Sequence, residues 1–195
     1  MKILGLTGSV GMGKSTAAKM LRNMGVPVYD ADASVHQMMR RGGTAVAKVA
    51  AAFPGVERDG AIDRTALGKR VFGDEPAMKR LEAIIHPLVR EDEKAFLAAQ
   101  RRRKTRLVVM DVPLLFESGR QKRYDATMVV TAPALLQRAR VMARPGMTTA
   151  RYAAILARQM PDVEKRKRAD FIVPSGLGRA VTWRSLRAAL RKLAR

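Results

Sequence analysis

Short apolar segments and helical patterns alternate along most of the chain. The segments typical of buried strands are 3–7, 26–30, 107–111, 126–131 and 170–173. Most of them are followed by apolar positions that recur every three to four residues, as in amphipathic helices. Because strands that alternate with helices usually pair in parallel, the pattern predicts an α/β fold with a doubly wound, five-stranded parallel sheet.

The stretch between the second and third of these strands differs from the rest. From residue 44 to about 104, apolar residues recur only at helical spacing, and no strand pattern is present. Asp63 precedes one helical pattern as an N-cap would. The long pattern of 78–97 is interrupted at His86-Pro87. We therefore expect a helical insertion at about 41–104.

A second irregular stretch lies nearer the C-terminus. A helix predicted from about Pro133 to Met142 ends in crowded arginines, and Pro145-Gly146 separates it from a helix that Thr148 or Thr149 can cap. Two basic helices joined by such a break look like a lid whose arginines close over phosphates, although any single arginine is better explained as a solvated surface residue. The expected organisation is one kinase-type domain with a core at about 1–40, 105–140 and 169–195, and a lid at about 141–168.

The residues between the first strand and the first helix match a phosphate-binding loop. Gly8-Ser9-Val10-Gly11-Met12-Gly13-Lys14-Ser15 fits G-x-x-x-x-G-K-[ST] at every fixed position. In such a loop, backbone N–H groups and the helix N-terminus bind phosphate oxygens. Lys14 then reaches the β- and γ-phosphates, and the Ser15 hydroxyl can ligate Mg²⁺. The flanking strand and helix supply the context that a chance glycine-rich turn lacks, so a nucleoside-triphosphate site is predicted.

Two acidic residues follow predicted strands. Asp32 comes after the strand at 26–30, and Asp111 ends the strand at 107–111. Ligands of open α/β sheets bind at the carboxyl ends of strands, so both carboxylates are placed for chemistry. Asp32 is equally well explained as the N-cap of the following helix. Asp111 resembles a Walker-B carboxylate that helps hold Mg²⁺, and it is equally well explained as an acid that caps a strand end.

The composition limits the remaining possibilities. With 47% hydrophobic residues the chain of 195 residues is globular, and no apolar run is long enough to cross a bilayer. The first strand begins almost at once, which leaves no room for a signal peptide. The absence of cysteine excludes disulfides and thiolate metal sites. We therefore expect a cytoplasmic protein that does not contact a membrane.

The formal net charge of +21 raises the question of nucleic-acid binding. The basic runs at 101–104 and 165–168 are not interleaved with aromatic residues. Both fall where helices are predicted to end, and cations complement the helix dipole there. A basic surface on an enzyme with polyanionic substrates explains the charge without a nucleic acid. We expect small-molecule partners and a monomer or weak homo-oligomer.

A phosphate loop with an insertion and a lid is typical of small-molecule kinases, which must hold an acceptor and exclude water. The guanine-reading N-K-x-D of GTPase-type switches is absent. The chain also resembles the dephospho-CoA kinase family along nearly its whole length. The residues that carry this resemblance are those of the phosphate loop, Val28–Asp32, Asp63-Arg64, Leu81-Glu82, Ile85–Pro87, Pro113–Glu117, Gln159 and Ala169–Phe171.

The resemblance implies an activity and a set of roles. The family transfers the γ-phosphate of ATP to the ribose 3′-hydroxyl of dephospho-CoA, the last step of coenzyme A synthesis. It implies that Asp32 is the base that deprotonates this hydroxyl. It also implies Mg²⁺ held by Ser15. The residues implied for ATP are Gly8, Gly11, Met12, Gly13, Lys14, Ser15 and Thr16.

The resemblance places further residues around these. Arg144, with Arg140 second, would make the lid contact with the phosphates. His86 and Glu117 would lie on the acceptor side, Glu117 without a defined role. If the family resemblance is set aside, His86 is explained as the residue before a proline at a helix break. Ser175-Gly176 departs from the Asn-Gly that the family often carries in the turn that meets adenine.

Two other functions are compatible with parts of the sequence. Another P-loop kinase, acting on a nucleoside or nucleotide, would share Lys14, Ser15 and the lid. It would give no reason for the His-Pro and P-L-L-F-E segments. A non-enzymatic nucleotide-gated or nucleic-acid-binding protein would explain the charge, and it predicts binding with a steep dependence on salt.

Overall fold

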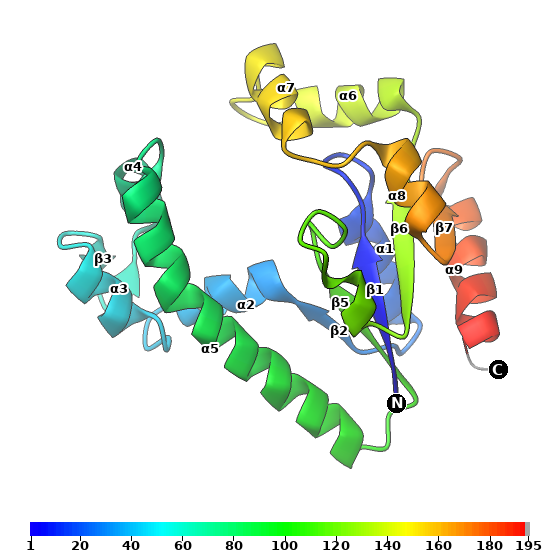
Figure 1. The fold of residues 1–195 in the computed structure, drawn as a ribbon, viewed down its shortest axis with the longest axis horizontal. Helices are drawn as coiled ribbons and strands as arrows, with labels where there is room; N and C mark the ends of the chain where they lie inside the picture. Colours follow the sequence, from blue (N-terminus) through cyan, green and yellow to red (C-terminus); the bar gives the residue numbers. More distant parts are fainter. Residues whose placement is uncertain (194–195) are drawn as a thin grey trace. The chain divides into compact units, whose positions relative to one another are not determined.

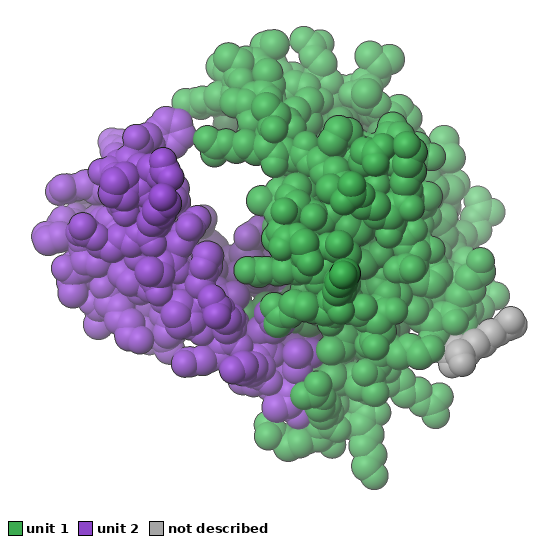
Figure 2. All heavy atoms as spheres, viewed as in Figure 1, with its two compact units in different colours: residues 1–29, 100–195 green, residues 30–99 purple. Residues whose placement is uncertain are grey.

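The computed structural model describes residues 1–193, which fall into two compact units (Figure 2). Among the described residues, 1–29 and 100–193 make up the first unit, and residues 30–99 make up the second. The hydrophobic pattern predicted that the insertion starts at about residue 41. The second unit begins earlier, at Asp30. Among the described residues, no helix combines the length and apolar character needed to span a membrane.

The first unit is built around a five-stranded sheet in the order β2-β5-β1-β6-β7 (Figure 1). Its central strand β1 pairs in parallel with β5 and β6, and β6 pairs in parallel with β7. The predicted five-stranded α/β sheet is confirmed, and each of the five expected segments overlaps one of its strands. The strands are β1 (Lys2–Thr7), β2 (Val28–Asp30), β5 (Leu107–Asp111), β6 (Ala126–Thr131) and β7 (Phe171–Pro174).

Burial of successive residues explains why these strands are apolar without alternation. Leu4 and Leu6 are fully buried, and so are the neighbours Val108 and Val109 on β5, so both faces of the sheet are covered. One core joins the sheet to α1 (Lys14–Asn23) and α9 (Arg179–Leu193). The other helices of this unit are η1 (Arg120–Arg123), α6 (Ala134–Met142), α7 (Thr149–Ala157) and α8 (Asp162–Arg168).

The predicted break between the two basic helices is present. Helix α6 ends at Met142, and α7 begins at Thr149, where the Thr148 hydroxyl accepts the Arg151 N–H at 3.2 Å. Gly146 in the break has a φ of 70°, a left-handed conformation that favours glycine. The prediction that Thr148 or Thr149 caps the second helix is therefore confirmed for Thr148.

The second unit is mainly helical and has its own core. It contains α2 (Ala31–Met38), α3 (Val46–Ala52), α4 (Arg64–Val71) and most of α5 (Glu75–Arg102). Residues Met38 and Met39 at the end of α2 are buried in this core, and α2 for this reason belongs to the unit. As predicted, Asp63 caps α4 by accepting the Thr65 and Ala66 N–H groups at 2.9 and 3.0 Å.

The prediction that this stretch contains no strand is wrong. Two short strands, β3 (Glu57–Arg58) and β4 (Ala61–Ile62), form an antiparallel hairpin. Their two-residue loop is Asp59-Gly60, whose φ angles of 51° and 76° are both positive. An Asp-Gly loop is the strongest local signal for such a hairpin, and the strands are too short to show an alternating pattern.

The predicted interruption at His86-Pro87 is also wrong. Helix α5 runs without a break from Glu75 to Arg102 and contains Pro87 (Figure 1). A proline removes one backbone hydrogen bond and crowds the preceding turn. Ile85 and Leu88, on either side of it, are both buried in the core of the unit. Packing on both sides of Pro87 keeps the helix continuous.

Candidate active site

The phosphate loop lies between β1 and α1, as the sequence predicts. Gly11 and Gly13 have φ angles of 75° and 86°, which side-chain-bearing residues rarely adopt. Space is also limited, because a Cβ on Gly11 would lie 2.6 Å from Cγ2 of Val141 and 2.8 Å from the Gln137 carbonyl oxygen. Both glycines are therefore needed for the curled backbone of the loop.

The loop presents unsatisfied backbone donors. Within residues 1–193, the N–H groups of Gly11, Gly13, Lys14, Ser15 and Thr16 have no protein acceptor. The last three form the first turn of α1, where N–H groups have no partner within the helix and the dipole is positive. Such a cluster of donors forms an anion-binding site.

Lys14 adds a cation that is held by a neighbouring strand. Its Nζ is ion-paired and hydrogen-bonded to Oδ1 of Asp111, the last residue of β5, which pairs with β1 in the sheet. Asp111 is 3% exposed, so its carboxylate is buried. The pair brings together two residues that are 97 positions apart in the sequence. A lysine and a buried carboxylate thus lie beside the loop.

The residues predicted to bind Mg²⁺ supply the right kind of ligand. Ser15 offers a hydroxyl in the exposed first turn of α1, and Asp111 offers a carboxylate at the strand end. Mg²⁺ prefers oxygen ligands and is commonly bound by one or two protein groups together with waters and substrate phosphates. Among the described residues, no cluster of three or more His, Cys, Asp or Glu side chains could hold a metal without such help.

Two glutamines fix the tip of the loop. The Val10 N–H donates to Oε1 of Gln159 at 3.1 Å, and Nε2 of Gln137 donates to the Val10 carbonyl oxygen at 2.8 Å. Gln137 belongs to α6 and Gln159 follows α7. Helix α6 and the segment after α7 are therefore tied to the phosphate loop through Val10. In the sequence analysis, Gln159 appeared only among the residues that carry the family resemblance. No sequence pattern indicated a role for Gln137.

Arg140 joins the loop to the turn after β7. Its guanidinium donates to the carbonyl oxygen of Gly11 at 3.3 Å and to the hydroxyl and carbonyl oxygens of Ser175 at 3.0 and 2.9 Å. The Ser175 hydroxyl donates in turn to the Met12 carbonyl oxygen at 2.6 Å. Arg140 and Ser175 thus fix the backbone of the loop. Arg144 lies beyond the end of α6, is exposed, and has no side-chain partner within residues 1–193.

Glu117 makes contacts that its sequence position did not indicate. Its Oε1 lies 2.8 Å from Nζ of Lys165 and accepts the Met160 N–H at 2.9 Å. Lys165 is fully buried, although it belongs to one of the basic runs. Burial opposes ionisation of Glu117, but the Lys165 ammonium and the Met160 amide outweigh it and hold the pKa of its carboxyl below the ordinary value. The pair supports the chain directly after Gln159.

Replacing Glu117 with Gln should lower the stability of the protein. The amide can still accept the Met160 N–H, but the Lys165 ammonium is left buried without a counter-ion. Removing one partner of a buried ion pair costs about 3 kcal/mol. Urea unfolding is expected to show a lower midpoint with an unchanged slope. Glu164→Gln removes the exposed pair between Glu164 and Lys167 (3.0 Å) and serves as the matched control, with no measurable change expected.

The effect of Glu117→Gln should also depend on pH. Because the pKa of Glu117 is lowered in the folded state, its ionisation stabilises the fold above the unfolded pKa, and this contribution is lost as the pH falls through the folded value. The difference between wild type and Glu117→Gln should therefore be full near pH 7 and shrink below about pH 4. A difference that stays constant down to pH 3 would contradict the ion pair as its cause.

In the second unit, a different aspartate caps α2. Asp30, not Asp32, occupies the N-cap, and its Oδ1 accepts the Ala33 N–H at 3.0 Å. The capping explanation for Asp32 is therefore wrong. Asp32 lies in the first turn of α2 and is exposed, and no described residue hydrogen-bonds or ion-pairs with its carboxylate. His86 is also exposed, on α5.

Comparison with known proteins places this loop in a family. A family model for dephospho-CoA kinase matches residues 2–177. The dephospho-CoA kinase of Paramagnetospirillum magneticum is 69% identical over 166 residues, which are 85% of this chain and 78% of that protein. The dephospho-CoA kinase of Mesorhizobium japonicum is 58% identical over 178 residues, 91% of this chain and 89% of that protein.

Solved structures agree at the level of the fold. The protein TT1252 from Thermus thermophilus superposes with a TM-score of 0.81 at 37% identity, covering 98% of this chain and 97% of that one. A dephospho-CoA kinase from Campylobacter jejuni gives 0.71 at 22% identity over 98% and 97% of the chains, a likeness that concerns the fold alone. Since its relatives match over most of their own length and the family model spans residues 2–177, the chain belongs to the dephospho-CoA kinase family.

Proposed function

We propose that this protein transfers the γ-phosphate of ATP to the ribose 3′-hydroxyl of dephospho-CoA and releases CoA and ADP. The observation that carries the proposal is the open phosphate loop, with Lys14 at its end, in a chain of this family. Phosphoryl transfer asks a protein mainly to position the reactants and to neutralise charge. The loop N–H groups and Lys14 supply both for the triphosphate.

The transfer itself exchanges one P–O bond for another. The 3′-oxygen of the acceptor attacks the γ-phosphorus, the bond from this phosphorus to the β,γ-bridging oxygen breaks, and ADP leaves with the bonding electrons. We assign the proton of the 3′-hydroxyl to the Asp32 carboxylate. Its exposure and its lack of partners among residues 1–193 support this role, because a base must be reachable by its substrate.

The remaining groups would stabilise the phosphates. The Ser15 hydroxyl and the Asp111 carboxylate would hold Mg²⁺, which would supply neutralisation of charge on the triphosphate. Arg144 is exposed and its side chain has no partner in the part of the chain that the structure describes, so we assign it the lid contact with the phosphates, while Arg140 acts through the loop backbone. His86 is assigned to the acceptor side. We place the reaction in the cytoplasm.

An assay of acceptor specificity tests the proposal. ADP release from ATP and Mg²⁺ is measured by a coupled assay in the presence of dephospho-CoA or of a panel of nucleosides and nucleotides. We expect dephospho-CoA to stimulate ADP release and the panel to give little above background. Stimulation by a nucleoside without stimulation by dephospho-CoA would replace the proposal with a nucleoside kinase.

A further inference from the structure

Two side chains from distant parts of the chain hold carbonyl oxygens of the phosphate loop. Nε2 of Gln137 donates to the Val10 carbonyl oxygen at 2.8 Å, and the Ser175 hydroxyl donates to the Met12 carbonyl oxygen at 2.6 Å. Gln137 belongs to α6, and Ser175 directly follows β7. The carbonyl groups on either side of Gly11 are therefore both fixed by groups outside the loop.

Fixing a carbonyl oxygen also fixes the amide of the next residue. The peptide groups of the loop are trans, and the C=O and N–H bonds of a planar trans peptide group point in opposite directions. The Val10 carbonyl shares its peptide group with the Gly11 N–H, and the Met12 carbonyl shares its own with the Gly13 N–H. Both N–H groups must therefore point away from the side chains that hold the carbonyls. Both are among the loop amides without a protein acceptor within residues 1–193.

The same two residues also pack directly against the glycines. A Cβ on Gly13 would lie 2.8 Å from Oγ and 3.1 Å from Cβ of Ser175, and a Cβ on Gly11 would lie 2.8 Å from the Gln137 carbonyl oxygen. The loop is thus held in its curled conformation by contacts that do not involve a ligand. A loop that is already ordered loses less conformational freedom when it binds, so its affinity is higher.

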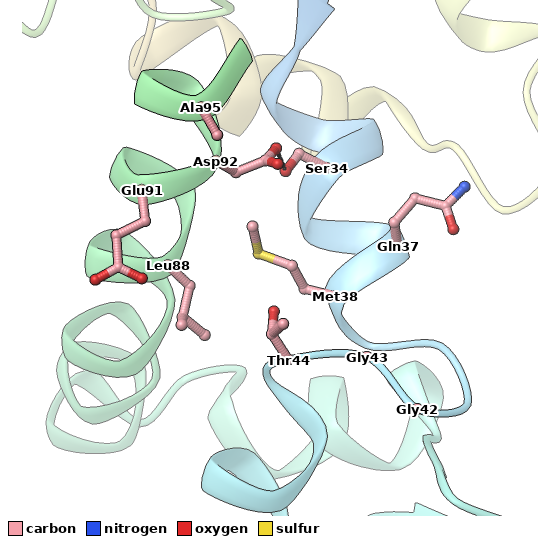
Figure 3. Close-up of a pocket in the computed structure, with 10 residues that line it drawn as sticks. All are labelled: Ser34, Gln37, Met38, Gly42, Gly43, Thr44, Leu88, Glu91, Asp92 and Ala95. Atoms are coloured by element: carbon pink, nitrogen blue, oxygen red, sulfur yellow. Dashed lines mark hydrogen bonds between the residues drawn. The ribbon is translucent and has the colours of Figure 1, made fainter. Parts of the chain in front are cut away.

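The cavity of the second unit does not suit a triphosphate. It has a volume of about 540 Å³ and lies between α2, residues 42–44 and α5 (Figure 3). In a chain with 38 Lys and Arg, none of the described residues that line it is basic, and Glu91 and Asp92 of α5 are acidic. Carboxylates repel phosphate groups. The loop is therefore better suited to the phosphates than this cavity.

We propose that Ser175 and Gln137 are positioning residues for the triphosphate. By holding the Met12 and Val10 carbonyl oxygens, they direct the N–H groups of the two following glycines toward the phosphate oxygens. This inference rests on the proposed function, which assigns a triphosphate to the loop. Neither side chain has to touch the nucleotide, because each acts through a peptide group. Amides aimed at the phosphates in advance need no reorientation on binding or during transfer.

Ser175→Ala and Gln137→Met each remove one of the two donors. In Ser175→Ala, the Arg140 guanidinium keeps its bonds to the carbonyl oxygens of residue 175 and Gly11 at 2.9 and 3.3 Å, so the turn stays tied to the loop. Gln137 is 6% exposed, and methionine fills a similar volume without an N–H donor. Both variants should therefore keep the fold and lose one carbonyl contact.

Matched controls remove similar hydrogen bonds away from the loop. The Ser118 hydroxyl donates to the Leu115 carbonyl oxygen at 3.2 Å, which makes Ser118→Ala the control for Ser175→Ala. Gln100 is 7% exposed, and its Oε1 accepts the Thr105 hydroxyl at 2.9 Å, which makes Gln100→Met the control for Gln137→Met. Urea unfolding of all four variants measures the loss of stability, so that an effect on binding can be compared at similar stability.

The test measures displacement of a fluorescent ATP analogue by ATP and by inorganic tripolyphosphate, with Mg²⁺ and without an acceptor. We expect both ligands to bind about threefold to tenfold more weakly to Ser175→Ala and to Gln137→Met, and with wild-type affinity to the two controls. Tripolyphosphate has no base, so a loss confined to ATP would indicate contact with the nucleoside and overturn the proposal. Wild-type affinities in both variants, or equal losses in the controls, would also overturn it.

A spectroscopic measurement separates positioning from a general loss of stability. In NMR spectra of the isotope-labelled protein without ligand, Ser175→Ala should shift the amide signal of Gly13, and Gln137→Met should shift that of Gly11. Unshifted signals would overturn the proposal even if affinity falls. Neither experiment requires phosphate transfer. If these effects are found while dephospho-CoA is not phosphorylated, the proposed function alone fails, and if turnover is normal while they are absent, this inference alone fails.

Discussion

Asp32→Asn is expected to lower kcat by about 10²–10⁴-fold, the range that general-base catalysis contributes, while the KM for ATP changes little. The asparagine side chain has nearly the same size but cannot accept the proton of the 3′-hydroxyl. Because Asp32 has no hydrogen-bond or ion-pair partner among the described residues, its replacement should not disturb the fold. Steady-state kinetics with ATP and dephospho-CoA varied in turn give both constants.

Asp30→Asn provides the control for this experiment. Asp30 caps α2, and asparagine caps helices about as well as aspartate, so the start of the helix should be kept. We expect this variant to retain most of the activity. Undiminished turnover in Asp32→Asn would remove Asp32 from the mechanism, and the base would then have to be sought elsewhere.

Lys14→Ala is expected to damage both nucleotide binding and turnover. In the proposed mechanism the ammonium contacts the β- and γ-phosphates in both the ground state and the transition state, so kcat/KM for ATP should fall by about 10²–10³-fold, with KM raised and kcat lowered. The Lys14 side chain also contacts the buried Asp111 carboxylate, so urea unfolding is measured alongside the kinetics to separate a loss of stability from a loss of catalysis.

Lys19→Ala is the matched control for Lys14→Ala. Lys19 lies on the same helix, is exposed, and is outside the phosphate loop. Its removal lowers the net charge by the same amount, and wild-type kinetics are expected. A Lys14→Ala variant that binds ATP as wild type does would contradict the assignment of Lys14 to the triphosphate, whereas equal losses in both variants would indicate a general effect of charge.

The sequence was sufficient for the sheet because its signal is local. Each strand is a short apolar run, and each lies in a sheet that is buried on both faces, so hydropathy alone marks it. The phosphate loop could also be predicted from the sequence, since the backbone conformation at Gly11 and Gly13 requires glycine. Two errors about helices and strands in the second unit have different causes. A hairpin of two-residue strands has no measurable period, and at Pro87 tertiary packing outweighed a local preference.

Side-chain partners were much harder to predict than elements. In α8 the valine at position 163 is 58% exposed, whereas Lys165 is fully buried against Glu117. Hydropathy would assign the two residues the other way round. The cap of α2 was likewise misjudged: the sequence offered Asp32 as a possible N-cap, whereas Asp30, two positions earlier, occupies it.

The sequence by itself determined the α/β sheet, the phosphate loop and the family to which the chain is similar, because each of these is carried by short segments that can be recognised one at a time. Only the tertiary structure decided which distant residues meet: Lys14 with Asp111, Val10 with Gln137 and Gln159, and Glu117 with Lys165. The physical reason is that a charged or polar side chain has the same local pattern whether it faces water or a buried partner. The difference in free energy between the exposed side chain and the buried, paired side chain depends on the residues that the fold packs around it.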